Sequence, residues 1–272
     1  MRRLYEFRRL RAAFLKVFFT STLLMAALGA VYVILQSTGS MSAFSYAFVA
    51  LPTSVRNFFG IISSLDLSEP LAYFCRMMYI PMLVSSILWL AQGARTLNAE
   101  QTSGLAELLF TQPGTRSALY WKRYTGGLLA ILANLGLLGG LTSLLFRFAL
   151  GITDPSYYTA IWIVFGRMVA VHVFCWNLGI LFSAICSSPV RAGWYALCVF
   201  LAMTLTTLLP VSFSGLSVLW SLSFIHYAIP EYVLHLGFHY SLNQIIMMCI
   251  AFPITAIPAW LLLRTKEIDC ED

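Results

Sequence analysis

Three arginines lie within long apolar stretches of the sequence: Arg76, Arg147 and Arg167. A charge at membrane depth is costly, so such a residue either contacts a substrate or pairs with another group and holds helices together. Arg147 lies near the end of its stretch and can extend to the interface, which favours a structural role. Arg76 is within reach of the acids Asp66 and Glu69, and Arg167 lies deepest. We therefore treat Arg76 and Arg167 as candidates for a substrate path that would suit an anionic group or a peptide carbonyl.

Two further polar residues, His172 and Asn177, follow Arg167 in the same apolar stretch. Their spacing does not place the three side chains on one strict helical face. Both are candidates for the substrate path. Hydrogen bonds between helices are the favoured alternative to a relay through these residues.

Glu231, His235 and His239 recur at i, i+4 and i+8 and would share one face of a helix. Carboxylate and imidazole groups can bind metal ions, so the three form a weak candidate metal site. They lack the HExxH arrangement and a cysteine partner, which favours an ordinary helix whose polar face meets water. The chain shows no nucleophile–base pair or paired carboxylates, and we expect neither a catalytic residue nor a cofactor in it.

The composition predicts the elements that position these residues. Hydrophobic residues make up 60% of the chain and charged residues 10%, against roughly 25% charged in a soluble domain. A membrane-spanning helix needs about 20 mostly apolar residues. Six stretches meet this requirement: 14–36, 71–94, 124–149, 158–186, 194–211 and 242–263. The sequence therefore predicts an all-α polytopic membrane protein with six transmembrane helices, the second of them kinked by Pro81.

The distribution of basic residues predicts the orientation. Arginine and lysine gather before the first stretch, after the second and after the sixth, whereas the opposite loops contain only Arg56. By the positive-inside rule, both termini are cytoplasmic. We expect the chain in a cell membrane, with the bacterial cytoplasmic membrane as the first choice. The net charge of +6 comes without a basic stripe interleaved with stacking aromatics, which argues against nucleic acid as a partner.

Three segments outside the predicted spans also carry information. In residues 1–13, apolar side chains recur at helical spacing among arginines. This predicts an amphipathic helix in the cytoplasmic interface, after which the chain turns into the bilayer; the alternative is a plain basic anchor. The apolar external segments 37–70 and 212–241 predict short helices that do not cross. Within the third span, Gly136 and Gly140 form a small-xxx-small pair that favours close helix packing.

The segment 95–123, between the second and third spans, is the most informative. It is the most polar long stretch close to the predicted spans, yet it contains a compact apolar run from Leu105 to Phe110. Pro113 then ends any helix formed by this run. This pattern predicts a short helix, then a sharp turn, and then a second helix that leads into the next span. A helix with exposed leucines needs a partner surface.

These residues resemble a motif of the permeases of ABC-2-type transporters: Glu, three residues, Gly, then Glu-Leu-Leu, then Pro, then Arg, and finally a basic residue that enters the third span, here Arg123. The sequence departs from that pattern at Leu105, where threonine is common, and at Lys122, where glycine is common. In that family the segment is a coupling helix that docks on the ATPase subunit. The resemblance assigns the docking surface to Glu100, Gly104, Leu105, Glu107, Leu108, Leu109, Phe110, Pro113 and Arg116. The alternative is a helix that packs on its own bundle.

The chain contains no GxxxxGK[ST] pattern, so a phosphate-binding loop of that type is absent from the sequence. The resemblance therefore implies a separate ABC ATPase that binds ATP and Mg, and a second permease, either identical or a paralogue. The expected function is export of a substrate such as a peptide, a lipid or a drug. The alternatives are a secondary transporter or channel, and a sensor or immunity subunit that uses the same scaffold without transport.

Overall fold

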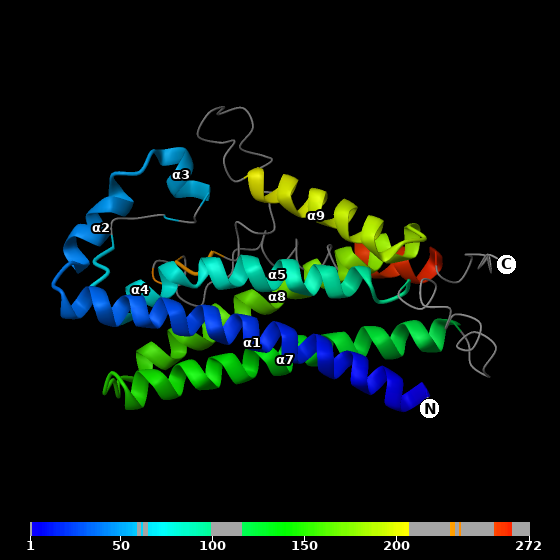
Figure 1. Ribbon diagram of the computed structural model, residues 1–272, viewed down its shortest axis with the longest axis horizontal. Coiled ribbons are helices and arrows are strands. Elements are labelled where there is room, and N and C mark those ends of the chain that lie inside the picture. Colours follow the sequence, from blue (N-terminus) through cyan, green and yellow to red (C-terminus); the bar gives the residue numbers. More distant parts are fainter. Residues whose placement is uncertain are drawn as a thin grey trace.

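The computed structural model describes residues 2–58, 61, 65–98, 116–206, 229–231, 234 and 253–262. All regular structure in these residues is helical, and the long helices run side by side as an elongated bundle (Figure 1). The helices are α1 (Arg2–Ser37), α2 (Met41–Val49), α3 (Thr53–Phe58), α4 (Pro70–Met77), α5 (Tyr79–Ala94), α7 (Arg116–Phe148), α8 (Pro155–Ile185), α9 (Pro189–Leu205) and a short helix at Pro253–Leu262.

Four of these segments are long and apolar enough to cross a membrane: Phe7–Ser37, Pro70–Ala94, Ser117–Phe148 and Pro155–Ile185. They coincide with the first four predicted spans, which confirms a helical chain compatible with a membrane. The predicted fifth span is represented by the 17 residues of α9. Of the predicted sixth span, only Pro253–Leu262 lies within the described residues. The count of six therefore stays a prediction.

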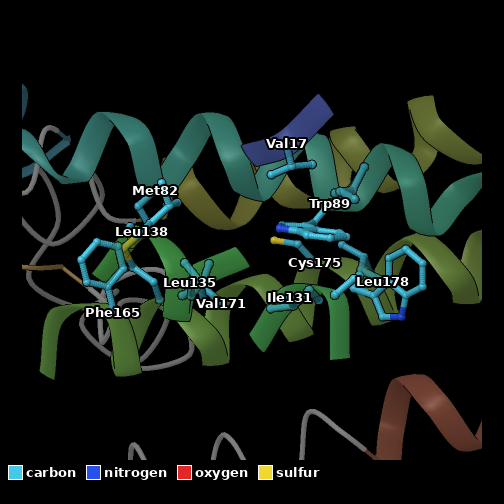
Figure 2. Close-up of a cluster of buried hydrophobic side chains, with 14 of the residues drawn as sticks. Val17, Met82, Trp89, Ile131, Leu135, Leu138, Phe165, Val171, Cys175 and Leu178 are labelled. Carbon is cyan, nitrogen blue, oxygen red and sulfur yellow. The ribbon is translucent and has the colours of Figure 1, made fainter. Parts of the chain in front are cut away.

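The core of the bundle forms where α8 meets α5 and α7. Trp89 from α5 lies beside Cys175 from α8, and Ile131 and Leu135 from α7 cover them (Figure 2). These side chains are almost fully buried. Helices α5, α7 and α8 therefore supply the largest share of the buried apolar residues in the described chain.

Two glycines allow α5 and α8 to approach closely. A Cβ atom on Gly179 would lie 2.3 Å from the carbonyl oxygen of Leu90, and one on Gly93 would lie 2.4 Å from the carbonyl oxygen of Trp176. Backbone lies on backbone at this crossing, so only glycine fits there. The sequence analysis did not single out this pair, because the two residues belong to different predicted spans.

The predicted packing role of Gly136 and Gly140 is wrong for contacts within the described chain. A Cβ atom on either residue would meet nothing within 4 Å, whereas one on Gly127 would lie 2.2 Å from the Trp176 ring. Gly136 and Gly140 share a helix face with exposed leucines, including Leu129 and Leu132. Spacing alone identified a close-packing motif, but it could not show which face of α7 meets the bundle.

The predicted break between an interfacial helix at residues 1–13 and the first span is also wrong. Helix α1 runs without interruption through 36 residues. Between Arg2 and Leu28 the sequence contains neither proline nor glycine, so nothing interrupts the backbone hydrogen bonds. The first basic turns are an extension of the span.

Two other expectations for the second span and the loop before it are confirmed. The segment 37–70 holds two helices of 9 and 6 residues, both too short to cross a membrane. The second span is interrupted at Met78, between α4 and α5. Pro81 lacks the N–H that would otherwise bond to the carbonyl of Met77, which accounts for the interruption at this point.

Candidate functional site

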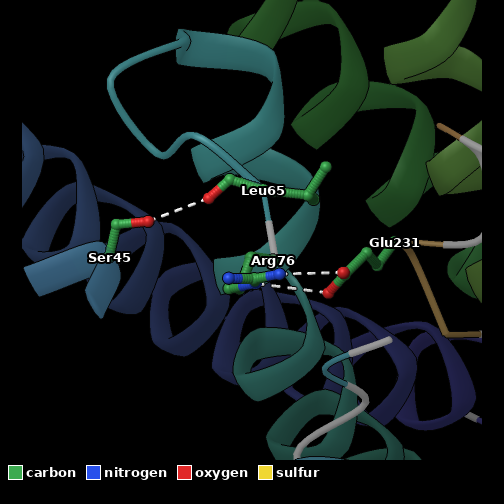
Figure 3. Close-up of polar contacts among 4 residues, drawn as sticks. All are labelled: Ser45, Leu65, Arg76 and Glu231. Carbon is green, nitrogen blue, oxygen red and sulfur yellow. Dashed lines mark hydrogen bonds and ion pairs between the residues drawn. The ribbon is translucent and has the colours of Figure 1, made fainter. Parts of the chain in front are cut away.

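Arg76 makes a buried ion pair with Glu231 (Figure 3). The Arg76 Nη2 atom lies 2.8 Å from Oε1 of Glu231, and Nε lies 3.2 Å from Oε2. The two side chains are 2% and 1% exposed. This bidentate geometry joins α4 to a segment 155 positions later in the chain.

The expected partners of Arg76, Asp66 and Glu69, are engaged elsewhere, so that prediction is wrong. Asp66 accepts hydrogen bonds from the side chain and from the backbone N–H of Ser68, and these bonds lower the pKa of the carboxyl. Glu69 accepts a hydrogen bond from the Tyr157 hydroxyl at 3.1 Å. Both acids thereby stabilise the loops around α4, while Arg76 points into the bundle.

The ion pair also bears on the candidate metal site. Both carboxylate oxygens of Glu231 accept hydrogen bonds from Arg76, which leaves this residue poorly suited to bind a cation. The other two members, His235 and His239, lie outside the described residues. Within the part of the chain that the structure describes, no group of three His, Cys, Asp or Glu residues could hold a metal ion.

The remaining substrate-path candidates lie in α8 and are buried. Arg167 and His172 are fully inaccessible and Asn177 nearly so. The Nε2 atom of His172 lies 2.7 Å from Oγ of Ser85 on α5. The Ser85 hydroxyl donates to the carbonyl of Pro81, so its oxygen can accept a hydrogen bond from the Nε2–H of His172. The predicted interhelical hydrogen bond is therefore confirmed for His172. By contrast Arg147, at the end of α7, is exposed, as its position in the sequence predicted.

The predicted coupling segment is described only at its two ends. Glu100, Gly104, Leu105, Glu107, Leu108, Leu109, Phe110 and Pro113 lie outside the described residues, and Arg116 is the first residue of α7. The residues just before the gap are held firmly by neighbouring helices. The backbone N–H of Leu97 donates to Ser183 Oγ at 3.0 Å, and Nδ2 of Asn98 donates to the carbonyl of Cys186 at 2.7 Å.

Two arginines hold the same backbone from the other side. Arg9 on α1 donates from Nη2 to the carbonyl of Arg95 at 2.8 Å and from Nη1 to that of Thr96 at 3.3 Å. Arg123 on α7 donates from Nη1 to the carbonyl of Thr96 at 2.5 Å. Sequence analysis missed these contacts. Arg9 was used only for orientation, and Arg123 for orientation and as the basic residue of the ABC-2-type motif. The signal that could have predicted these contacts is the set of open carbonyls where α5 ends.

We call this region, formed by the start of α1, the end of α5 and the start of α7, the basic end of the bundle. A cavity of about 590 Å³ opens there. Its lining comprises Phe7, Arg9, Leu10, Ala13, Gln92, Thr96, Lys122, Arg123, Gly126 and Trp176.

We call the opposite region, which holds α2, α3, α4 and the Arg76–Glu231 pair, the ion-pair end. A second cavity, of about 500 Å³, lies there between α1, α4 and α7. Its wall is almost entirely apolar. The rings of Tyr32 and Tyr73 lie 4.9 Å apart in that wall, and the Tyr73 hydroxyl donates to the carbonyl of Leu28. The two cavities thus differ in chemistry: the lining of the first combines three cations with apolar groups, whereas the lining of the second is almost entirely aliphatic and aromatic.

Comparison with protein-family models, with curated proteins and with solved structures finds no match for this chain. The geometry of these regions and the resemblance in the segment 95–123 are therefore the basis for a functional proposal.

Proposed function

We propose that this chain is the membrane subunit of an ABC-2-type exporter that is driven by a separate ATPase. Two features support the proposal: the Glu–Gly–Glu-Leu-Leu–Pro–Arg pattern between residues 100 and 116, and the four long apolar helices. The proposal includes cytoplasmic termini, two further spans formed in part by α9 and Pro253–Leu262, and a second permease subunit. ATP and Mg would be bound by the ATPase.

The observation that carries the proposal is how the base of the segment 95–123 is attached. Residues 95–98 are hydrogen-bonded to α1 through Arg9, to α7 through Arg123 and to α8 through Ser183. A load applied to a helix in this segment would therefore reach three long helices directly rather than dissipate in a loose linker. A coupling element requires such an attachment, whereas a helix that only packs on its own bundle does not.

The ion-pair end supplies the other half of this mechanism. Arg76 and Glu231 fix α4 to the segment that precedes the last helix, in a buried position where the pair is costly to separate. Movement transmitted from the basic end would either separate Arg76 from Glu231 or move the two residues together. In this proposal Arg76 is a structural residue of the exit side, and Arg167 is the buried cation in α8 that stays a candidate for substrate contact.

The test is association with an ABC-type ATPase encoded in the same genome. The full chain is purified with the ATPase co-expressed, and the bound ATPase is measured by its nucleotide-dependent activity. The variant Leu108→Glu/Leu109→Glu should abolish association, because two charges on an apolar docking face oppose desolvation. Leu150→Glu is the matched control, since Leu150 is an exposed leucine at the ion-pair end.

Association that survives in the double variant would contradict docking through this segment. No association of the wild-type chain with any ABC ATPase of that genome would contradict the proposed function itself. Membrane insertion of each variant is checked first by fractionation and thermal unfolding, so that a misfolded protein is not mistaken for a loss of docking.

A further inference from the structure

The cavity at the basic end brings cations from two helices to one place. Arg9 comes from α1, and Lys122 and Arg123 come from α7. Arg9 and Arg123 both donate to the carbonyl of Thr96, so their guanidinium groups are held side by side. Like charges at this separation raise the local positive potential, and the described residues of the lining include no carboxylate.

Neutral donors line the same cavity. Trp176 from α8 is 4% exposed, and its indole N–H finds no acceptor among the residues that the structure describes. An indole N–H can only donate, and leaving it buried without an acceptor costs free energy. The side-chain amide of Gln92 is also part of the lining. Cations and neutral donors around one cavity favour a ligand that presents several acceptor oxygens and negative charge, as a phosphate group does.

The third part of the lining is apolar. Phe7, Leu10 and Ala13 follow one another at i, i+3 and i+6 on α1 and line the cavity together. Phe7 is the first residue of the first candidate span, and Lys122 lies five positions after the first residue of the third. In a membrane, this would put the cavity where the helices enter the apolar layer, at the level of lipid phosphate groups. A free phosphate compound would make no use of the apolar wall.

We propose that this cavity binds one anionic phospholipid, with the phosphate group near Arg9, Lys122 and Arg123 and the first part of an acyl chain along Phe7 and Leu10. Basic pockets between transmembrane helices are suited to such headgroups. The proposal rests on the chain lying in a membrane, but it does not require transport or an ATPase partner. A bound lipid here would touch α1, α7 and Trp176 of α8, and so would tie lipid composition to the base of the segment 95–123.

The test is lipid binding to the purified full chain in a non-ionic detergent, measured by native mass spectrometry. Phosphatidylglycerol and phosphatidylcholine with the same acyl chains are compared, with inorganic phosphate as a third probe. The variant is Lys122→Gln, because Lys122 is exposed and its loss leaves the bonds of Arg9 and Arg123 to the backbone intact. The matched control is Arg11→Gln, which removes one exposed charge from α1 outside the cavity.

We expect phosphatidylglycerol to bind in a one-to-one complex in preference to phosphatidylcholine, and Lys122→Gln to weaken that complex about fivefold, since one cation near a lipid surface contributes that much. Arg11→Gln should leave it unchanged. Equal binding of the two lipids, equal weakening by both variants, or saturation by inorganic phosphate without lipid would each overturn the proposal. Thermal unfolding of both variants verifies that the comparison is made between folded proteins.

Discussion

The two ends of this helical bundle handle charge in opposite ways. At the ion-pair end, one arginine meets one glutamate, and both are buried. At the basic end, Arg9 and Arg123 converge on one backbone carbonyl beside a cavity that Lys122 also lines. The first arrangement is neutral and closed, whereas the second concentrates positive charge where a ligand can approach.

This difference indicates which end tolerates change. A buried ion pair gains little over an apolar contact of the same size, but it becomes very unfavourable when one partner is lost. Hydrogen bonds from a charged arginine to backbone carbonyls contribute about 1.5–3 kcal/mol each, less than the cost of losing one partner of a buried ion pair. The buried ion pair should therefore respond to single substitutions sharply, and the basic end gradually. Two substitutions test this contrast, and a third tests an exposed acid near the ion pair.

The largest effect is expected from Glu231→Ala. It leaves the Arg76 guanidinium buried without its carboxylate, at a cost of about 3–5 kcal/mol. The free energy of unfolding is measured by titration with SDS in mixed micelles. The double variant Arg76→Met/Glu231→Leu should recover most of this loss, because it removes both charges together. A cost below about 1 kcal/mol for Glu231→Ala would show that the pair is not buried in the membrane-embedded protein.

The four long helices were predictable from the sequence because length and hydropathy alone define them. The partner of Arg76 was not. Local reasoning offered Asp66 and Glu69, which are near in sequence, whereas the structure uses Glu231. A contact between residues so far apart depends on how α4 is placed against the later segment, and a single sequence carries no direct signal of that placement.

A smaller effect is expected at the basic end from Ser183→Ala. Ser183 accepts a hydrogen bond from the buried backbone N–H of Leu97, and its loss should cost about 1–3 kcal/mol. The amide of Leu97 should also exchange faster with deuterium, which mass spectrometry of peptides from this region can measure. Ser143→Ala is the control, since Ser143 bonds only within its own helix. Equal effects of the two variants would contradict an anchoring role for Ser183.

The basic end shows a second limit of sequence analysis. The cluster of arginines in the first turns predicted an orientation, and the resemblance predicted a docking segment nearby, but neither indicated that Arg9 and Arg123 bond to the same carbonyl. That convergence requires α1 and α7 to be neighbours of the end of α5. The interruption between α4 and α5 was foreseeable from the sequence, because its cause, the missing N–H of Pro81, is local.

The smallest effect is expected from an exposed acid at the ion-pair end, Asp154. Its side chain caps the first turn of α8 by accepting from the backbone N–H of Ser156 at 2.9 Å, and this bond lowers the pKa of the carboxyl. The folded pKa therefore lies below that of the unfolded chain, about 3.9. The cap contributes fully above that value, and its contribution is lost as the pH falls through the folded pKa.

Asp154→Ala should accordingly lower the midpoint of thermal unfolding slightly at neutral pH, and the difference from wild type should shrink below about pH 4. Asp154→Asn keeps a cap acceptor that does not titrate, so its midpoint should stay close to that of wild type at neutral pH. A deficit of Asp154→Ala that stays constant into strong acid would contradict a charge-dependent cap. Together with Glu231→Ala, these variants compare two acids at one end of the bundle. Loss of the buried glutamate leaves the Arg76 guanidinium without its carboxylate, whereas loss of the exposed aspartate removes only a helix cap.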